Sequence, residues 1–167
     1  MIETERLLIK PLSAEELIKH IKLPDELAKE LGFKPSKALI DEETQEAIIN
    51  DLLPNIVDPN RDSLFYTMWI IIERKEKTII GGICFHGQAD KDGEVEIGYG
   101  IDDEYINKGY MTETIQSLLT WLEKRKDVRI VKAETEQTNI SSIRVLEKTG
   151  FKQFNRVGDL IVFKYNF

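Results

Sequence analysis

Two spacings of hydrophobic residues divide the middle of this chain into a strand followed by a helix. Residues 94–101 alternate with a period of two, so that Val95 and Ile97 share one face and are expected to point into a core. Beyond Gly109 the apolar residues recur at helical spacing. These residues are Met111, Ile115, Leu118, Leu119 and Leu122. The pattern therefore predicts a strand, a tight turn around residues 107–113 and a helix.

The N-terminal half predicts one strand, several helices and then two more strands. Residues 6–11 form a first strand that Pro11 ends, and Ser13 with Glu16 matches a capping box at the start of a helix. The other expectations for this half are helices between residues 24 and 53, a break at 34–36, a loop at 54–60, and adjacent antiparallel strands at 64–72 and 79–85.

The C-terminal part predicts a crossover, a second helix and a hairpin. Residues 128–135 read as a strand that runs parallel to residues 94–101, because a helix connects the two. Asn139 or a neighbour caps the next helix, and Gly150 ends it. The terminal hairpin is expected from residues 151–154 and 160–167. Residues 1–167 are thus predicted to form a single α/β (α+β) domain, with a mixed, mainly antiparallel sheet of six or seven strands flanked by helices.

Composition narrows the class of protein. The formal charge of −7 disfavours nonspecific binding to nucleic acid or to anionic membranes, and favours a cationic small molecule or peptide. No apolar run reaches the length of a membrane span and the first residues lack a signal-peptide pattern, so a cytoplasmic location is expected. Cys84, the single cysteine, forms no internal disulfide or cysteine zinc cluster and is expected to be an inert core thiol. No metal site is expected.

The turn before the central helix is a candidate anion site. Backbone N–H groups at a helix N-terminus lack intrahelical acceptors and lie at the positive end of the helix dipole. The turn has only Gly109 at its centre and is not a complete glycine-rich phosphate motif. On local sequence alone, an ordinary strand-to-helix turn is an equal alternative.

Several motifs in a fixed order along the chain make the interpretation of this turn more specific. They are residues 3–12 (ETERLLIKPL), 80–83 (IGGI), 96–99 (EIGY), 108–113 (KGYMTE) and the helical segment 137–151. Together they resemble the GNAT superfamily of acyl-coenzyme A dependent N-acetyltransferases. Within that superfamily they resemble the branch of the ribosomal-protein N-terminal acetyltransferases, the RimJ/RimL-like proteins. The resemblance covers most of the chain.

The resemblance implies a reaction and a set of binding residues. The reaction is direct acetyl transfer from acetyl-coenzyme A to a primary amine in a ternary complex. The pyrophosphate is expected on the turn, and the pantetheine arm along a strand that splays from its parallel neighbour. The residues implied for the cofactor are Ile97, Gly98, Tyr99, Ile101, Asn107, Lys108, Gly109, Tyr110, Met111, Thr112, Asn139 and Ser142.

The chain departs from the family pattern at three positions. Ile106 and Met111 replace residues usual in the phosphate loop, although backbone donors need no particular side chain. Leu146 stands where many members have a tyrosine that protonates the departing thiolate. The resemblance therefore assigns thiolate stabilisation to Ser142, with Tyr99 as an alternative proton carrier. For Ser142, an ordinary helix-surface serine is an equal alternative, and Asn139 can equally be a simple cap.

The base that deprotonates the acceptor is the remaining catalytic group. Glu96 resembles the strand-borne glutamate of the family, and burial is expected to raise its pKa towards neutrality. Glu94 shares its face and is expected to hold a cationic acceptor, while a solvated strand face remains the alternative for both. The acceptor is expected to be a peptide N-terminus or a small cationic amine, and the protein a monomer or homodimer. A noncatalytic acyl-coenzyme A binding module and a purely structural domain are the alternative functions.

Overall fold

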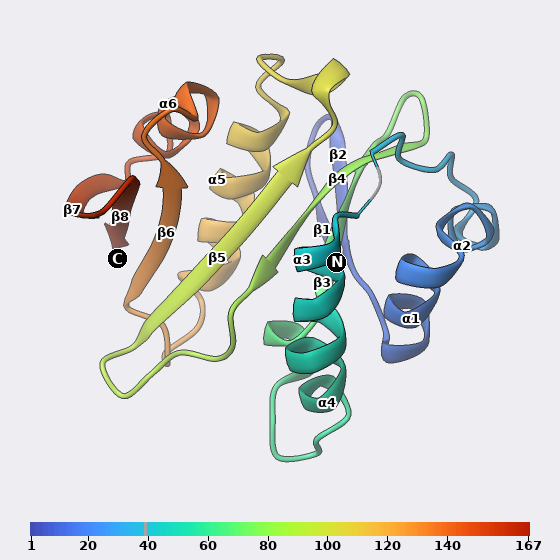
Figure 1. Cartoon of the computed structure of the whole chain (residues 1–167), viewed down its shortest axis with the longest axis horizontal. Helices are drawn as coiled ribbons and strands as arrows, with labels where there is room; N and C mark the ends of the chain where they lie inside the picture. Colours follow the sequence, from blue (N-terminus) through green and yellow to red (C-terminus); the bar gives the residue numbers. More distant parts are fainter. Residues whose placement is uncertain (39) are drawn as a thin grey trace.

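The computed structural model describes residues 1–38 and 40–167, which build one mixed sheet between two layers of helices (Figure 1). The sheet has eight strands in the order β1-β2-β3-β4-β5-β6-β8-β7. Among these eight strands of the described residues, β5 and β6 form the one parallel pair, and every other neighbouring pair is antiparallel. The strands are β1 (Ile2–Glu3), β2 (Leu7–Pro11), β3 (Met68–Glu73), β4 (Thr78–Phe85), β5 (Glu94–Ile101), β6 (Ile130–Glu136), β7 (Lys152–Val157) and β8 (Leu160–Asn166).

Helices cover both faces of the sheet. The longest helix, α5, lies behind β5 in Figure 1. The N-terminal helices lie in front of the strands, on the other face of the sheet. The α-helices are α1 (Ala14–Lys22), α2 (Pro24–Leu31), α3 (Glu42–Ala47), α4 (Leu53–Ile56), α5 (Tyr110–Leu122) and α6 (Ile140–Lys148). A π-helical turn, Ile48–Leu52, joins α3 to α4. None of the helices in the described residues is both long and apolar enough to cross a membrane.

The predicted architecture is confirmed. The number of strands and the bounds of two elements differ from the prediction. The sheet has eight strands because Ile2–Glu3 adds a short edge strand that no periodicity reveals. The predicted strand at 64–72 starts only at Met68, because Ser63–Phe65 forms a 3-10 turn that Asp62 caps. The predicted loop at 54–60 begins as helix α4, whose first turn accommodates Pro54.

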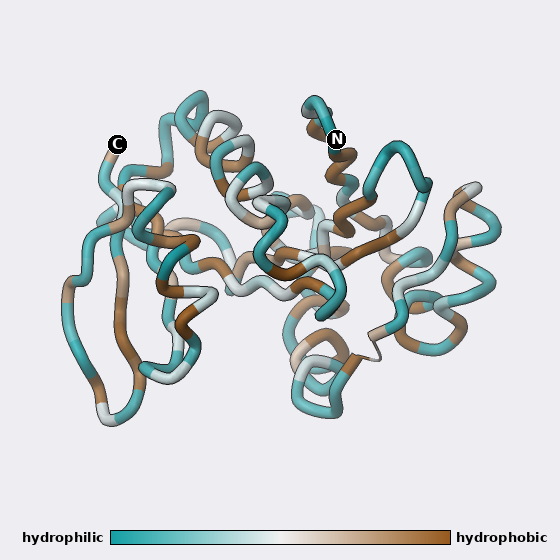
Figure 2. Tube along the Cα trace, turned by 90° about the horizontal axis from the view of Figure 1, so that it is seen from above, coloured by the Kyte–Doolittle hydropathy of each residue, from teal (hydrophilic) through white to brown (hydrophobic). Residues whose placement is uncertain are grey.

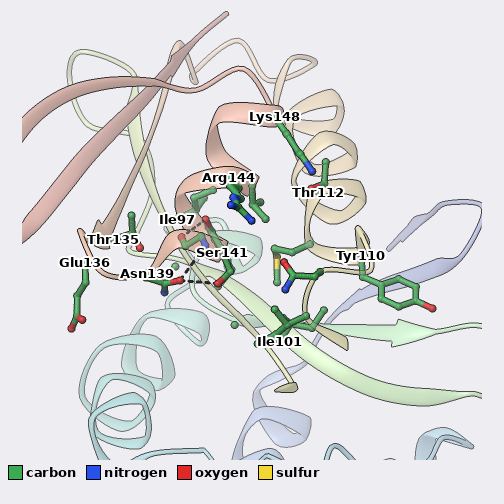
Figure 3. A pocket seen from close by; sticks show the side chains of 18 of the residues that line it. Ile97, Ile101, Tyr110, Thr112, Thr135, Glu136, Asn139, Ser141, Arg144 and Lys148 are labelled. Carbon is green, nitrogen blue, oxygen red and sulfur yellow. Dashed lines mark hydrogen bonds between the residues drawn. The ribbon is translucent and has the colours of Figure 1, made fainter. Parts of the chain in front are cut away.

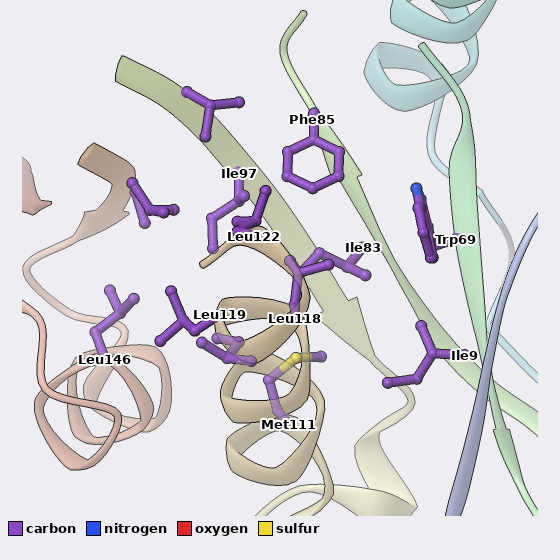
Figure 4. Close-up of a cluster of buried hydrophobic side chains, with 14 of the residues drawn as sticks. Ile9, Trp69, Ile83, Phe85, Ile97, Met111, Leu118, Leu119, Leu122 and Leu146 are labelled. Atoms are coloured by element: carbon purple, nitrogen blue, oxygen red, sulfur yellow. The ribbon is translucent and has the colours of Figure 1, made fainter. Parts of the chain in front are cut away.

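The helical layers bury two separate apolar clusters. Ile70, Ile72 and Ile79 pack against α1, α2 and the π-helical turn on one face. On the other face, Leu118 of α5 and Leu146 of α6 belong to the larger cluster, which Figure 4 shows between the helices and the sheet. Hydrophobic residues follow the central strands, and the outer loops are hydrophilic (Figure 2). The fold is therefore held by apolar surfaces on both sides of one sheet.

The parallel pair separates halfway along its length. β5 and β6 pair from Glu94 with Ile130 to Ile97 with Ala133, and pairing then stops although both strands continue. Beyond that point β5 remains paired to β4, and β6 to β8. The backbones of the two strands are pulled apart by these different partners. This confirms the predicted splay of the central parallel strands.

Leu118→Ala tests whether α5 is the main anchor of the larger core. Leu118 is only 1% exposed. Its truncation is expected to lower the free energy of unfolding by about 3 kcal/mol, since the apolar contacts are lost and a cavity remains. Urea unfolding measures the change. Gln116→Ala, at an exposed position on the same helix, is the matched control and is expected to change stability by less than about 0.5 kcal/mol. Equal effects of the two variants would contradict this role for α5.

Candidate active site

The turn before α5 exposes backbone donors. Asn107 and Gly109 have positive φ angles of 62° and 81°, and α5 starts at Tyr110 without a side-chain cap. The first intrahelical bond into this turn is donated by Glu113 N to Gly109 O. The N–H groups of Tyr110, Met111 and Thr112 therefore have no intrahelical acceptor, which is the arrangement that binds anions.

The N-terminal segment clamps this turn in place. Arg6 Nε donates to Glu113 Oε2 at 2.7 Å, and its Nη1 donates to the Lys108 carbonyl at 3.0 Å. Thr4 Oγ1 donates to the other oxygen of Glu113 at 2.6 Å. Burial raises the pKa of Glu113, but the hydrogen bonds from Thr4 and Arg6 outweigh it and hold the pKa below its ordinary value. The sequence motif at residues 3–12 indicated a family resemblance but not this contact.

A cavity of about 790 Å³ opens at the splay of β5 and β6. Most of the residues that sequence analysis implied for the cofactor line it, and several are shown in Figure 3. These are Ile97, Gly98, Tyr99, Ile101, Asn107, Gly109, Tyr110, Met111, Thr112, Asn139 and Ser142. Lys108 is the exception, since its side chain extends over the ring of Tyr105. The structure thus brings strand, turn and α6 around one space.

Met111 and Asn139 each combine a structural contact with a place on the cavity wall. Met111, which departs from the family pattern, is only 6% exposed and joins the core beneath the turn (Figure 4). Asn139 Oδ1 accepts from Ser142 N at 3.1 Å, so it caps α6, as expected for asparagine at this position. Ser141 Oγ donates to the same oxygen. Capping fixes the start of α6 and holds Ser142 at the cavity.

Tyr99 and Ser142 meet across the cavity from β5 and α6. Their hydroxyl oxygens are 2.8 Å apart and share a hydrogen bond. Burial raises the pKa of Tyr99 to about 12, although the bond to Ser142 acts in the opposite direction. Tyr99 therefore keeps its proton at neutral pH. Two residues that are 43 positions apart in the chain become one hydroxyl pair.

Sequence analysis missed the charged residues of the cavity wall. Arg144 and Lys148 on α6 line the cavity, and Figure 3 shows Lys148 beside Thr112 of α5. Their spacing of four residues places them on one helical face, which is a signal that the sequence contained. The missed carboxylates are Glu43, Glu134 and Glu136. Of these three, only Glu134 and Glu136 could have been recognised from the sequence, because their spacing of two residues places them on one face of strand β6.

Glu96 lies outside the residues that line the cavity. Its Oε2 accepts from Lys132 Nζ at 2.8 Å, and its Oε1 lies 3.5 Å from His86 Nδ1. Hydrogen bonding from His86 and then from Lys132 outweighs burial and lowers the pKa of Glu96 to about 2. The expectation that the pKa of Glu96 rises towards neutrality is therefore wrong, because the hydrogen bonds outweigh the effect of burial. Glu94 does share the face of Glu96, but it forms an ion pair with Lys164. The catalytic role of Glu96 stays a prediction.

His86 is held as a cation next to this carboxylate. Hydrogen bonding to Cys84 and to Glu96 raises the pKa of His86 to about 10. Cys84 is partly exposed and close to Gly98, so the expectation of a core thiol is wrong. Within residues 1–38 and 40–167, no three His, Cys, Asp or Glu side chains are grouped to hold a metal ion.

His86→Gln tests the contribution of this cation to stability. The folded pKa exceeds the ordinary value of 6.5, so the stabilisation is full below about pH 6.5 and is lost as the pH rises through about 10. Because His86 is half exposed, the loss at about pH 6 is expected to be no more than about 1 kcal/mol, or roughly 2–4 °C in Tm. The difference is expected to vanish near pH 10.5, as measured by thermal unfolding.

His20→Gln is the control for this experiment. Burial lowers the pKa of His20, so the pH trend of its variant is expected to have the opposite sign. An equal loss of stability for His86→Gln at both pH values would show that His86 stabilises the fold by packing and not by charge.

Comparisons with known proteins identify the family of this chain. Residues 6–152 match the family model described as an acetyltransferase (GNAT) domain. The uncharacterized N-acetyltransferase YjdG of Bacillus subtilis is 30% identical over 151 residues, which cover 90% of this chain and 89% of YjdG. The uncharacterized N-acetyltransferase p20 of Bacillus licheniformis is 26% identical and covers 90% of this chain and 81% of p20.

Solved structures share the whole fold. An acetyltransferase of the GNAT family from Bacillus anthracis has a TM-score of 0.65 and 20% identity, covering 99% of this chain and 97% of that chain. RimL, a ribosomal alpha-N-protein acetyltransferase in complex with coenzyme A, has a TM-score of 0.67 and 16% identity, covering 98% and 95%. The matched family model, the similarity to YjdG and the common fold lead to one conclusion: the chain belongs to the GNAT family of acetyltransferases.

Proposed function

We propose that this protein transfers the acetyl group of acetyl-coenzyme A directly to a primary amine in a ternary complex. The observation that carries the proposal is the cavity at the splay of β5 and β6, where exposed strand backbone, the turn before α5 and the Ser142 hydroxyl line one space. RimL is described in complex with coenzyme A. Because the neighbours include ribosomal-protein acetyltransferases, a peptide N-terminus is one proposed acceptor and a small cationic amine the other.

The residues around the cavity fit acetyl-coenzyme A. The free N–H groups of residues 110–112 suit the pyrophosphate, and the cations of Arg144 and Lys148 suit the phosphate charge. Around Gly100 no heavy atom lies within 4 Å of the position that a Cβ would take, so a ligand can approach the backbone of β5. The volume of about 790 Å³ lies in the usual range for small-molecule sites.

Ser142 is proposed to stabilise the leaving group. Acetyl-coenzyme A supplies the thioester, whose carbonyl carbon is attacked by the amine lone pair while the C–S bond breaks and the thiolate gains a proton. Ser142 Oγ can donate a hydrogen bond to the sulfur, since Tyr99 is protonated and can donate to Ser142 in turn. Leu146 is fully buried and supplies no acid. Solvent then completes the proton transfer.

The acceptor is proposed to lose its proton through water. A carboxylate with a pKa of about 2 takes a proton unfavourably from an ammonium group whose pKa is about 8 or higher. Glu96 therefore acts, in this proposal, through a water relay or by fixing Lys132 and His86 at the sheet surface. The same observation favours the second candidate function, a noncatalytic acyl-coenzyme A binding module.

Titration calorimetry and a thiol-release assay test the proposed function. Acetyl-coenzyme A is expected to bind, and its Kd to rise about tenfold in the double variant Arg144→Gln/Lys148→Gln, because the charge-assisted bonds to phosphate are lost. An amine library is expected to produce coenzyme A thiol. Binding without thiol release would identify the noncatalytic module, and no binding at millimolar concentration would reject both candidate functions.

Ser142→Ala tests the role of the hydroxyl pair. Loss of a hydrogen bond to a developing thiolate is expected to lower kcat roughly 10- to 100-fold, with little change in the KM of acetyl-coenzyme A. Steady-state kinetics measure both constants. Thr120→Ala, which removes an exposed hydroxyl of α5 away from the cavity, is the control.

Glu96→Gln in the same assay separates the two routes for the acceptor proton. The water route predicts that the variant keeps kcat within about tenfold and that kcat/KM still rises with pH through the pKa of the amine. Complete loss of turnover with intact binding of acetyl-coenzyme A would instead assign Glu96 as the base. An unchanged kcat in Ser142→Ala would reject the role of the serine.

A further inference from the structure

The basic and the acidic side chains that line the cavity lie on opposite faces of the sheet. Arg144 and Lys148 belong to α6, which packs on the same face as α5. On β6 the side chains of Ala133 and Thr135 are buried, so Glu134 and Glu136 point to the opposite face. Figure 3 shows Lys148 and Glu136 at opposite ends of the cavity. The cavity thus has a basic side and an acidic side.

Glu43 belongs to the acidic side and comes from a different layer. It lies in the first turn of α3, and the π-helical turn that follows α3 packs on the face of the sheet opposite to α5. The same residue lines the cavity together with the backbone of Gly98 and Gly100. The cavity therefore reaches from the helix layer of α6 to that of α3, and Glu43 lies at its α3 end.

The carboxylates of the acidic side differ in what they already bind. Glu134 forms an ion pair with Lys132 at 2.7 Å, and Glu136 accepts a hydrogen bond from Thr138. For Glu43, the described part of the chain provides no cation within ion-pair distance. Glu136 has no ion-pair partner either, but of the three carboxylates only Glu43 has neither an ion pair nor a side-chain hydrogen bond within the described residues, so its charge and its oxygen acceptors are available to a molecule that enters the cavity.

The reacting nitrogen is a poor partner for this charge. An amine attacks a thioester only after it has lost its proton, and a nearby carboxylate raises the pKa of an ammonium group and so keeps it protonated. A carboxylate aids binding without hindering the reaction when it pairs with a second cation that stays charged. Such a cation lies on the acceptor and apart from the nitrogen that is acetylated.

We propose that the acceptor carries a second cationic group and that Glu43 binds this group at the α3 end of the cavity. The inference rests on the proposed acetyl transfer and names the substrate class, a primary amine with a separate positive charge. Two sources share this chemistry, a diamine and a peptide with a basic residue after its N-terminus. Glu43 is a specificity-determining residue in this proposal and takes no part in the chemical step.

Matched acceptors test the proposal by the thiol-release assay. Alanyl-lysinamide and alanyl-norleucinamide have the same reacting α-amino group and differ in one charge, and 1,4-diaminobutane and butylamine form the second pair. The charged member of at least one pair is expected to have a kcat/KM about tenfold higher, mainly through KM, as for a hydrogen-bonded charge pair. The pair that shows the preference identifies the source of the second charge.

Glu43→Gln is expected to reduce this preference by about tenfold. Glu46→Gln, which removes the same charge from an exposed position of α3 outside the cavity wall, is expected to keep the wild-type preference. Thermal unfolding checks that both variants are folded. Absence of a preference in both pairs, or equal effects of the two variants, would overturn the inference while the transfer reaction stands. No thiol release with any amine would overturn the proposed function and this inference with it.

Discussion

The early end of the β5–β6 ladder is the constraint on which the rest of this structure depends. Four residue pairs hold the two parallel strands together, and after Ile97 and Ala133 each strand follows its antiparallel neighbour on the other side. An open space within a sheet would normally leave backbone groups without partners. Here the space adjoins the turn before α5 and the start of α6, so that the exposed backbone becomes part of the wall of the cavity.

The turn is held from a distant part of the chain. Arg6 and Glu113 are 107 positions apart, and their contact fixes the first turn of α5 against the N-terminal segment. Left-handed conformations at Asn107 and Gly109 persist because the surrounding contacts determine them. The negative charge of Glu113 is also favourable in the first turn of the helix. The geometry of the turn therefore depends on a part of the chain that does not line the cavity.

Charge on the α3 side of the sheet is arranged in two ways. His86, Glu96, Lys132 and Glu134 alternate in sign and neutralise one another across β4, β5 and β6. This network lowers the pKa of Glu96 and raises that of His86, which suits a structural role better than proton transfer at neutral pH. Glu43 stands apart from the network and is directed to the cavity by α3. Glu96 and Glu134 are thus paired with cations, whereas Glu43 has no ion-pair partner among the described residues.

The sequence by itself determined the elements whose signals are local. The period of two in β5, the helical spacing in α5 and the capping box of Ser13 and Glu16 each depend on residues a few positions apart, and each is confirmed. The tertiary structure decided the rest. The pairing of Tyr99 with Ser142 and of Glu96 with Lys132 joins residues 43 and 36 positions apart. The pKa of a side chain depends on such partners, so no local pattern could show that Glu96 is strongly acidic, or that Glu43 reaches the cavity.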